Sequence, residues 1–286
     1  MSTFKIILFS LFVATQAYSQ KFILDAGDSL CKYGNYYEAI TEYKRYIFIK
    51  SNNKIESSIY FKISKCYREL DDIPKSIYYL DKSILNSEND SLKSERKIDK
   101  AVILLATERY DIAELILIKE LHYSKYYSIK KRASFLLCID YIFQSEWEKS
   151  QNKFQKYVDY SLDIDENLLM EINNLFLEIK SHPGKNPLKA KLLSSILPGA
   201  GQFYCGDVRD GINALAINSL TVFLALNSIL NKQYLNFLPY LYIFKRYYSG
   251  NKLKAQFLCE TYNEKLNNKN IRLILNKLLL IEKINK

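Results

Sequence analysis

The stretch GDSLCKYGNYYEAITEY, residues 27–43, sets the pattern on which the first half of the chain is built. Two small residues of this stretch, Gly27 and Ala39, each begin a series of small residues spaced 37 positions apart. The first series is Gly27, Ser64, Ala101 and Cys138, and the second is Ala39, Ser76, Ala113 and Ser150. Apolar residues within each unit recur at three and four, the period of a helix. A repeat of this length is a helical hairpin that buries its apolar face only by stacking on its neighbours. The sequence therefore predicts an all-α fold, with an α-solenoid of about four hairpins.

The repeat resembles the tetratricopeptide repeat family. The first unit has that family's order of small and aromatic residues around the turn Gly34-Asn35, and polar pairs mark the same turn at Asp71-Asp72 and Glu108-Arg109. Later units match less well, since Ser replaces Ala at two positions and the proline that usually closes the second helix is missing. The resemblance covers about residues 21–160. It implies a surface for protein partners without identifying them, because such arrays bind many unrelated ligands.

The first residues predict export. Lys5 precedes an apolar run over residues 6–13, and Ala17-Tyr18-Ser19 is a small-x-small cleavage site, so residues 1–19 are expected to be a signal peptide. The run is too short to span a bilayer stably. An uncleaved anchor is the alternative. The repeats are therefore expected outside the cytoplasm.

Composition divides the chain at SHPGKNP, residues 181–187, which we interpret as a linker after a repeat domain over residues 20–180. Residues 1–180 carry 26 basic and 26 acidic side chains, whereas residues 181–286 carry 15 and 5. The whole excess charge thus lies beside the apolar segments of the second part. This arrangement suits anionic lipid headgroups better than nucleic acid, which requires basic and aromatic residues interleaved on one face.

Residues 211–230 contain no formal charge and, at about 1.5 Å per residue, are about 30 Å long, enough to cross a hydrocarbon core. Small and polar residues recur along one stripe of this predicted helix, the kind of face on which membrane helices pack closely. The stripe consists of Gly211, Ala214, Asn218, Thr221, Ala225 and Ser228. A buried helix of a soluble domain is the alternative.

The segment before this helix is interrupted by Pro198 and Gly199, so we expect it to be kinked or re-entrant and packed on the helix that follows. Gly199 and Gly201 would allow close backbone contact, Gln202 and Tyr204 could cap free carbonyls, and Gly206-Asp207 would turn the chain. The motif as a whole comprises Pro198, Gly199, Gly201, Gln202, Tyr204, Gly206, Asp207, Gly211, Ala214 and Asn218. It resembles the small two-transmembrane-helix domain appended to bacterial envelope proteins. That resemblance covers about residues 188–264 and implies membrane placement but no chemistry.

Topology is open between two and three membrane spans. Residues 234–244 are uncharged but few, and residues 245–286 hold ten basic and three acidic side chains, as a cytoplasmic tail does. An exported array with such a tail requires an odd number of crossings, which slightly favours three. Residues 265–286 form a basic amphipathic tail that either lies on the membrane or caps a bundle.

No pattern predicts catalysis or a bound cofactor, metal or small-molecule substrate. His122 and His182 are far apart in sequence, the five cysteines form no C-x-x-C pair, and Tyr204 stands where a dinucleotide loop requires glycine. Adjacent tyrosines such as Tyr78-Tyr79 either pack in the core, which we favour, or line a peptide groove. The sequence predicts a non-enzymatic scaffold of the bacterial inner membrane, with periplasmic repeats that bind an envelope protein. A direct role of the membrane module in transport or insertion is the alternative.

Overall fold

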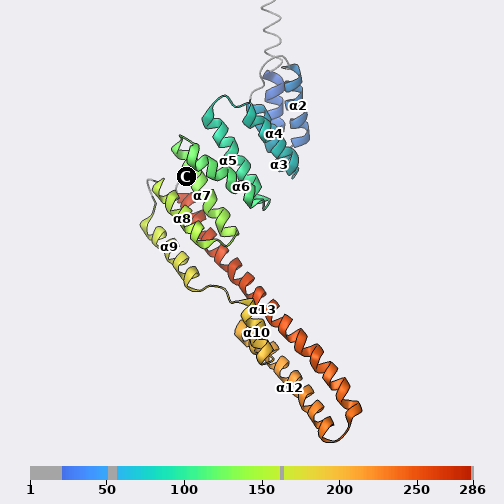
Figure 1. Cartoon of the computed structure of the whole chain (residues 1–286). Coiled ribbons are helices and arrows are strands. Elements are labelled where there is room, and N and C mark those ends of the chain that lie inside the picture. Colours follow the sequence, from blue (N-terminus) through green and yellow to red (C-terminus); the bar gives the residue numbers. More distant parts are fainter. Residues whose placement is uncertain (1–20, 51–56, 162–163, 285–286) are drawn as a thin grey trace, which may run out of the picture. The chain divides into compact units, whose positions relative to one another are not determined.

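A computed structural model describes residues 21–50, 57–161 and 164–284, and these residues form helices and short connections without a β-strand (Figure 1). The expected signal peptide lies outside the described residues. The chain divides into two compact units, Met1–Leu162 and Asp163–Lys286. The predicted all-α class is confirmed.

The first unit consists of four helical hairpins. Residues 21–32 form a helix that pairs with α2 (Tyr36–Ile49). The helices that follow α2 are, in chain order, α3 (Ser57–Glu69), α4 (Ile73–Leu85), α5 (Asp90–Ala106), α6 (Tyr110–Tyr123), α7 (Tyr127–Phe143) and α8 (Trp147–Asp159). Helices α3 and α4, α5 and α6, and α7 and α8 pack as pairs, and contacts of α4 with α5 and of α6 with α7 join one pair to the next. The predicted tetratricopeptide-like solenoid is confirmed.

Each hairpin turns on one residue in the left-handed region, and these residues are also 37 positions apart. They are Gly34, Asp71, Glu108 and Ser145, with φ of 82°, 59°, 58° and 58°. The residue after each donates its backbone N–H to a carbonyl five positions earlier, as in Asn35 to Leu30 at 2.9 Å and Glu146 to Tyr141 at 2.8 Å. These bonds satisfy carbonyls left open at a helix end. The repeat is thus as regular in its backbone as in its sequence.

The two small positions of each unit face each other where the helices of a hairpin cross. In the second hairpin, Ser64 Oγ donates to the Ser76 carbonyl at 2.7 Å, and Ser76 Oγ donates to the Ser64 carbonyl at 2.9 Å. In the fourth, Ser150 Oγ donates to the Cys138 carbonyl at 3.0 Å. Hydroxyls are tolerated in this core because backbone carbonyls accept their protons.

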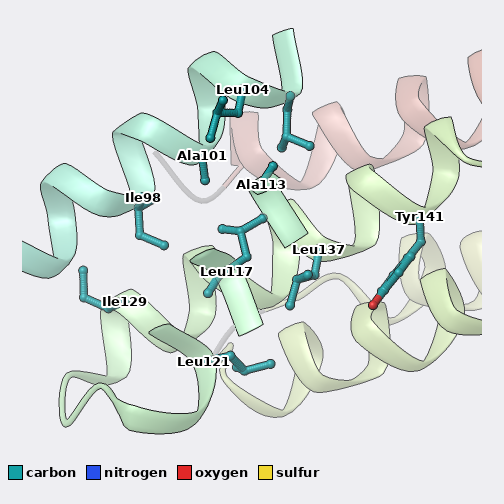
Figure 2. Close-up of a cluster of buried hydrophobic side chains, with 11 residues drawn as sticks. Ile98, Ala101, Leu104, Ala113, Leu117, Leu121, Ile129, Leu137 and Tyr141 are labelled. Atoms are coloured by element: carbon teal, nitrogen blue, oxygen red, sulfur yellow. The ribbon is translucent and has the colours of Figure 1, made fainter. Parts of the chain in front are cut away.

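In the third hairpin the two small positions are apolar, and the core there is continuous with that of α7. Figure 2 shows Ala101, Ala113, Leu117 and Leu137 in one cluster, and each of them is fully buried. In the first hairpin a side chain at Gly27 would meet the Tyr43 ring, since an added Cβ would lie 2.8 Å from Cε1. A small residue at these positions therefore leaves room for the large residues around the crossing.

The second unit begins earlier than the predicted linker. It contains α9 (Glu166–Ser181), α10 (Pro187–Ile196), α11 (Ala200–Cys205), α12 (Val208–Leu230) and α13 (Tyr234–Ile284). The structure therefore groups α9 with the C-terminal part, whereas the sequence assigned it to a repeat domain ending at residue 180. Tertiary contact with α13, which sequence composition does not reveal, is the reason.

Helix α13 runs through the predicted boundary between residues 264 and 265 without a break. No glycine or proline occurs from residue 251 to its end, so nothing local stops the helix. Ile274, Leu278 and Ile281 near that end are buried, and Lys277 Nζ lies 2.5 Å from Glu171 Oε2 of α9. The C-terminal part of α13 thus contacts α9 of the same unit.

Among the described helices, only α12 is both long and apolar enough to cross a membrane. It packs side by side with α13 as an antiparallel hairpin (Figure 1). Residues 234–244, considered above as a third span, are the first turns of α13 and not a separate helix.

Candidate interaction surfaces

The eight small repeat residues predicted from the sequence are all buried. They hold helices together and are closed to a ligand. Surfaces that a partner could reach must therefore be found among the larger side chains around them.

Tyrosines and lysines form one such surface on the first two hairpins. We define the tyrosine–lysine face as Lys44, Tyr60, Tyr67, Tyr78, Tyr79 and Lys82, which come from α2, α3 and α4. The Tyr67 and Tyr79 rings stack with centroids 5.4 Å apart, and Tyr78 meets Tyr79 edge-on at 5.1 Å. Tyr78 is 53% exposed, whereas Tyr79 is half-buried. Of this adjacent pair, one ring supports the surface and the other is open to a partner.

The lysines of this face are held by the tyrosines. Lys44 Nζ donates to Tyr67 Oη at 3.0 Å, and Lys82 Nζ lies 4.7 Å from the centroid of the Tyr78 ring. The hydrogen bond to Tyr67 raises the pKa of Lys44, and the Tyr78 hydroxyl raises that of Lys82. Both amines therefore stay charged at neutral pH. Ordered cations beside exposed aromatic rings suit carboxylates and apolar side chains of another protein.

In the second unit, the kinked motif packs by close backbone approach. Gly199, at φ 95°, begins α11, and a Cβ there would lie 2.3 Å from the Gly211 carbonyl oxygen. A Cβ on Gly201 would lie 2.0 Å from the Ala190 carbonyl oxygen. Glycine is required at both positions because any side chain would push apart backbones that touch. Pro198 lies in the turn that separates α10 from α11.

The polar residues Gln202 and Tyr204 of the motif bond to residues outside it. Gln202 accepts a hydrogen bond from Ser194 Oγ at 2.9 Å and donates to the Asn251 carbonyl at 3.2 Å and to its side-chain oxygen. The Tyr204 hydroxyl accepts from the Asn186 N–H at 3.2 Å. The buried Ser194–Gln202–Asn251 network joins α10, α11 and α13. Sequence analysis missed Ser194 and Asn251, although a buried asparagine beside Gly250 is a signal for such a network.

The remaining motif residues shape α12. Gly206, at φ 90°, ends α11, and the Asp207 side chain caps α12 by accepting from the Asp210 N–H at 2.9 Å. Gly211 is buried beneath Phe203. The predicted stripe is the face that α12 buries, apart from Ala214, which is half-buried.

A groove of about 830 Å³ runs between α12 and α13. Its lining includes Ala214, Asn218 and Tyr242 together with the cations Arg246 and Lys254. Asn218 is 3% exposed and donates to the Ala214 carbonyl at 2.7 Å, but its Oδ1 has no hydrogen-bond partner among the described residues. The groove thus combines apolar walls with the cation Arg246 and the ion pair of Lys254 with Asp210. Arg246 is a further residue whose place sequence analysis did not foresee.

We assign no catalytic site among the residues that the structure describes. Within the described residues, no three His, Cys, Asp or Glu side chains group closely enough to hold a metal ion. Gly199 precedes α11 and Gly201 lies within it, and both follow helix α10, whereas a dinucleotide-binding loop follows a strand.

No protein-family model matches the sequence, and no curated protein matches it significantly. A solved structure from a study of Pseudomonas aeruginosa PilF is similar over 79% of this chain and 98% of that chain, with 13% sequence identity and a TM-score of 0.44. At this level the similarity carries no argument about this chain.

Proposed function

We propose that this chain is a non-enzymatic scaffold of the bacterial cell envelope, anchored in the inner membrane, whose repeat unit lies in the periplasm and binds another protein. The tyrosine–lysine face is the observation that carries this proposal. It presents the exposed Tyr78 ring and the cations Lys44 and Lys82 over tyrosines that are buried or half-buried, whereas the small repeat positions are fully used in packing. The partner is an extended peptide or a helix in which carboxylates alternate with apolar side chains.

The membrane anchor is the second unit. Helix α12 supports this assignment by its length, its apolar composition and its exposed apolar face, which includes Ile212, Phe223 and Leu226. The basic excess of residues 181–286 would add attraction to anionic lipids.

The test of the scaffold begins with site-specific photocrosslinking in the native organism. A photoreactive amino acid replaces Tyr78, and in the control it replaces Tyr123, which is 84% exposed on α6. The protein captured only through Tyr78 is then purified for binding measurements. We expect the double variant Tyr78→Ala, Lys82→Ala to weaken its binding about 10- to 100-fold, whereas Tyr123→Ala leaves it unchanged. Equal effects of the two variants would contradict docking on this face.

The groove between α12 and α13 supports the second candidate function, a direct role of the membrane unit in transport or membrane-protein insertion. The two functions separate when the second unit is replaced by an unrelated membrane anchor. Full rescue of a deletion strain would exclude the direct role. Failure of rescue at normal expression would count against simple anchoring.

A further inference from the structure

In the far half of the α12–α13 hairpin, both helical arms are uncharged and expose largely apolar surface. Residues 219–230 of α12 and 234–244 of α13 carry no formal charge. Leu230 and Leu235, on either side of the connecting turn, are 80% and 89% exposed. A contiguous apolar surface of this kind marks contact with a protein or a membrane.

Charges limit how deep this hairpin can enter a membrane. Lys254 Nζ lies 3.5 Å from Asp210 Oδ2, which fixes the antiparallel register of the two helices. In that register Arg246 lines the groove together with Asn218, near the middle of α12. Lys245 and Arg246 therefore stand about halfway along the stretch of α12 that could span a bilayer.

Lengths favour half a bilayer over a whole one. The uncharged arm of α13, residues 234–244, measures about 16 Å, and the part of α12 opposite it, residues 219–230, measures about 18 Å, whereas a hydrocarbon core is about 30 Å thick. If α12 crossed the whole core, Lys245 and Arg246 would lie near its centre, where cations are costly. If the hairpin enters one leaflet, only Lys232 of the turn is carried to the midplane.

The base of the uncharged stretch is strongly basic. Five cations and two carboxylates lie there on α12 and α13 or at their ends: Arg209, Lys245, Arg246, Lys252, Lys254, Asp207 and Asp210. Positive charge at the headgroup level attracts anionic phospholipids.

We propose that the α12–α13 hairpin enters one leaflet of an anionic membrane as far as Lys245 and Arg246. The chain enters the leaflet along α12 and returns along α13 to the same side of the bilayer. This proposal rests on the membrane attachment in the proposed function, and it replaces a spanning topology of the second unit with insertion into one leaflet. Neither two nor three spans are then needed. The helices before α12 and the end of α13 lie on the same side of the bilayer.

The experiment measures the depth of single tryptophans in the full-length protein. Trp147 is the one tryptophan of the sequence, so Trp147→Phe provides the background for Leu220→Trp and Leu230→Trp. Each variant is reconstituted in phosphatidylglycerol–phosphatidylcholine vesicles whose acyl chains carry bromine at different depths. We expect Leu230→Trp to lose most fluorescence with bromine near the chain ends, and Leu220→Trp with bromine near the headgroups. A spanning α12 gives the opposite order, which would overturn the proposal.

Flotation with the same vesicles separates this proposal from the proposed function. Protein that fails to float would overturn membrane attachment itself, and the leaflet proposal with it. Protein that floats while neither tryptophan is quenched would show the hairpin covered by protein, for example by a second copy, and would overturn the leaflet proposal alone. The double variant Lys245→Gln, Arg246→Gln should lose preference for phosphatidylglycerol. Retained preference would contradict the placement of these cations at the headgroups, and the control Lys265→Gln, Lys269→Gln should keep it.

Discussion

Asp140 on α7 is a buried carboxyl group without a counterion, and removing its charge should stabilise the repeat unit. The residue is 0% exposed, and neither carboxylate oxygen has a hydrogen-bond partner among the described residues. Burial, together with the acidic side chains of Glu114, Asp111 and Glu146, raises the pKa of Asp140 to about 7. The nearby Gln144 amide opposes this rise without making a hydrogen bond of good geometry. The perturbation is Asp140→Asn, which keeps the shape and removes the charge.

The size of the effect follows from proton linkage. Between the unperturbed pKa of 3.8 and the folded pKa of about 7, the folded state binds the proton more tightly than the unfolded state. The free energy of unfolding of the natural protein therefore falls as pH rises through this window, by about 4 kcal/mol at most. In Asp140→Asn this loss is absent. The variant and the natural protein should have similar stability near pH 4, and the variant should be more stable above pH 7.

Trp147 lies at the start of α8 and reports unfolding of this hairpin by fluorescence. Urea denaturation of both proteins from pH 4 to 9 gives the difference in free energy of unfolding. Glu148→Gln is the control, since it removes an exposed negative charge of α8 that is not one of the carboxylates raising the pKa of Asp140, and it should change stability little. If the difference in free energy of unfolding does not vary with pH, or grows toward low pH, then the buried charge of Asp140 does not destabilise the repeat unit.

Two matched pairs of variants test the backbone arguments. Gly201→Ala should destabilise the second unit by about 3 kcal/mol or prevent its folding, because the new Cβ would meet a carbonyl oxygen. Gly250→Ala, in open space within α13, should slightly raise the melting temperature measured in detergent. Equal melting temperatures of the two variants would contradict the close packing at residue 201. Glu108→Gly should stabilise the first unit by about 0.5–1 kcal/mol, because glycine relieves a left-handed conformation, and Gly34→Glu should destabilise it by a similar amount. Urea denaturation measures both, and shifts of the same sign would show that the turn conformation does not govern stability.

The sequence by itself determined the repeat unit, because the information there is local and occurs four times. Small residues at fixed intervals permit two helices to cross, and a polar pair between them ends one helix and begins the next. The turn residue with positive φ also lies at the same position of each unit, although only in the first unit is it glycine, the residue type that this conformation favours. One hairpin therefore predicts the next three without knowledge of distant contacts.

Tertiary structure alone decided which side chains remain available to a partner. Tyr78 and Tyr79 are adjacent and chemically identical, yet one is exposed and the other half-buried because Tyr67 stacks on only one of them. The same holds for Asp140, whose lack of a partner depends on residues brought together from α6 and α8. Burial and pairing are properties of the packed array and not of any one repeat.

In the second unit the sequence predicted the glycine-dependent kink and the stripe that α12 buries, since both depend on residue size and spacing. It did not predict that Gln202 bonds to Asn251, 49 positions away, nor that Arg246 shares a groove with Asn218. Such partners are set by the antiparallel register of α12 and α13, and register comes from packing across the whole hairpin. That register places Lys245 and Arg246 midway along an otherwise apolar helix pair, and it therefore governs how far the hairpin enters a membrane.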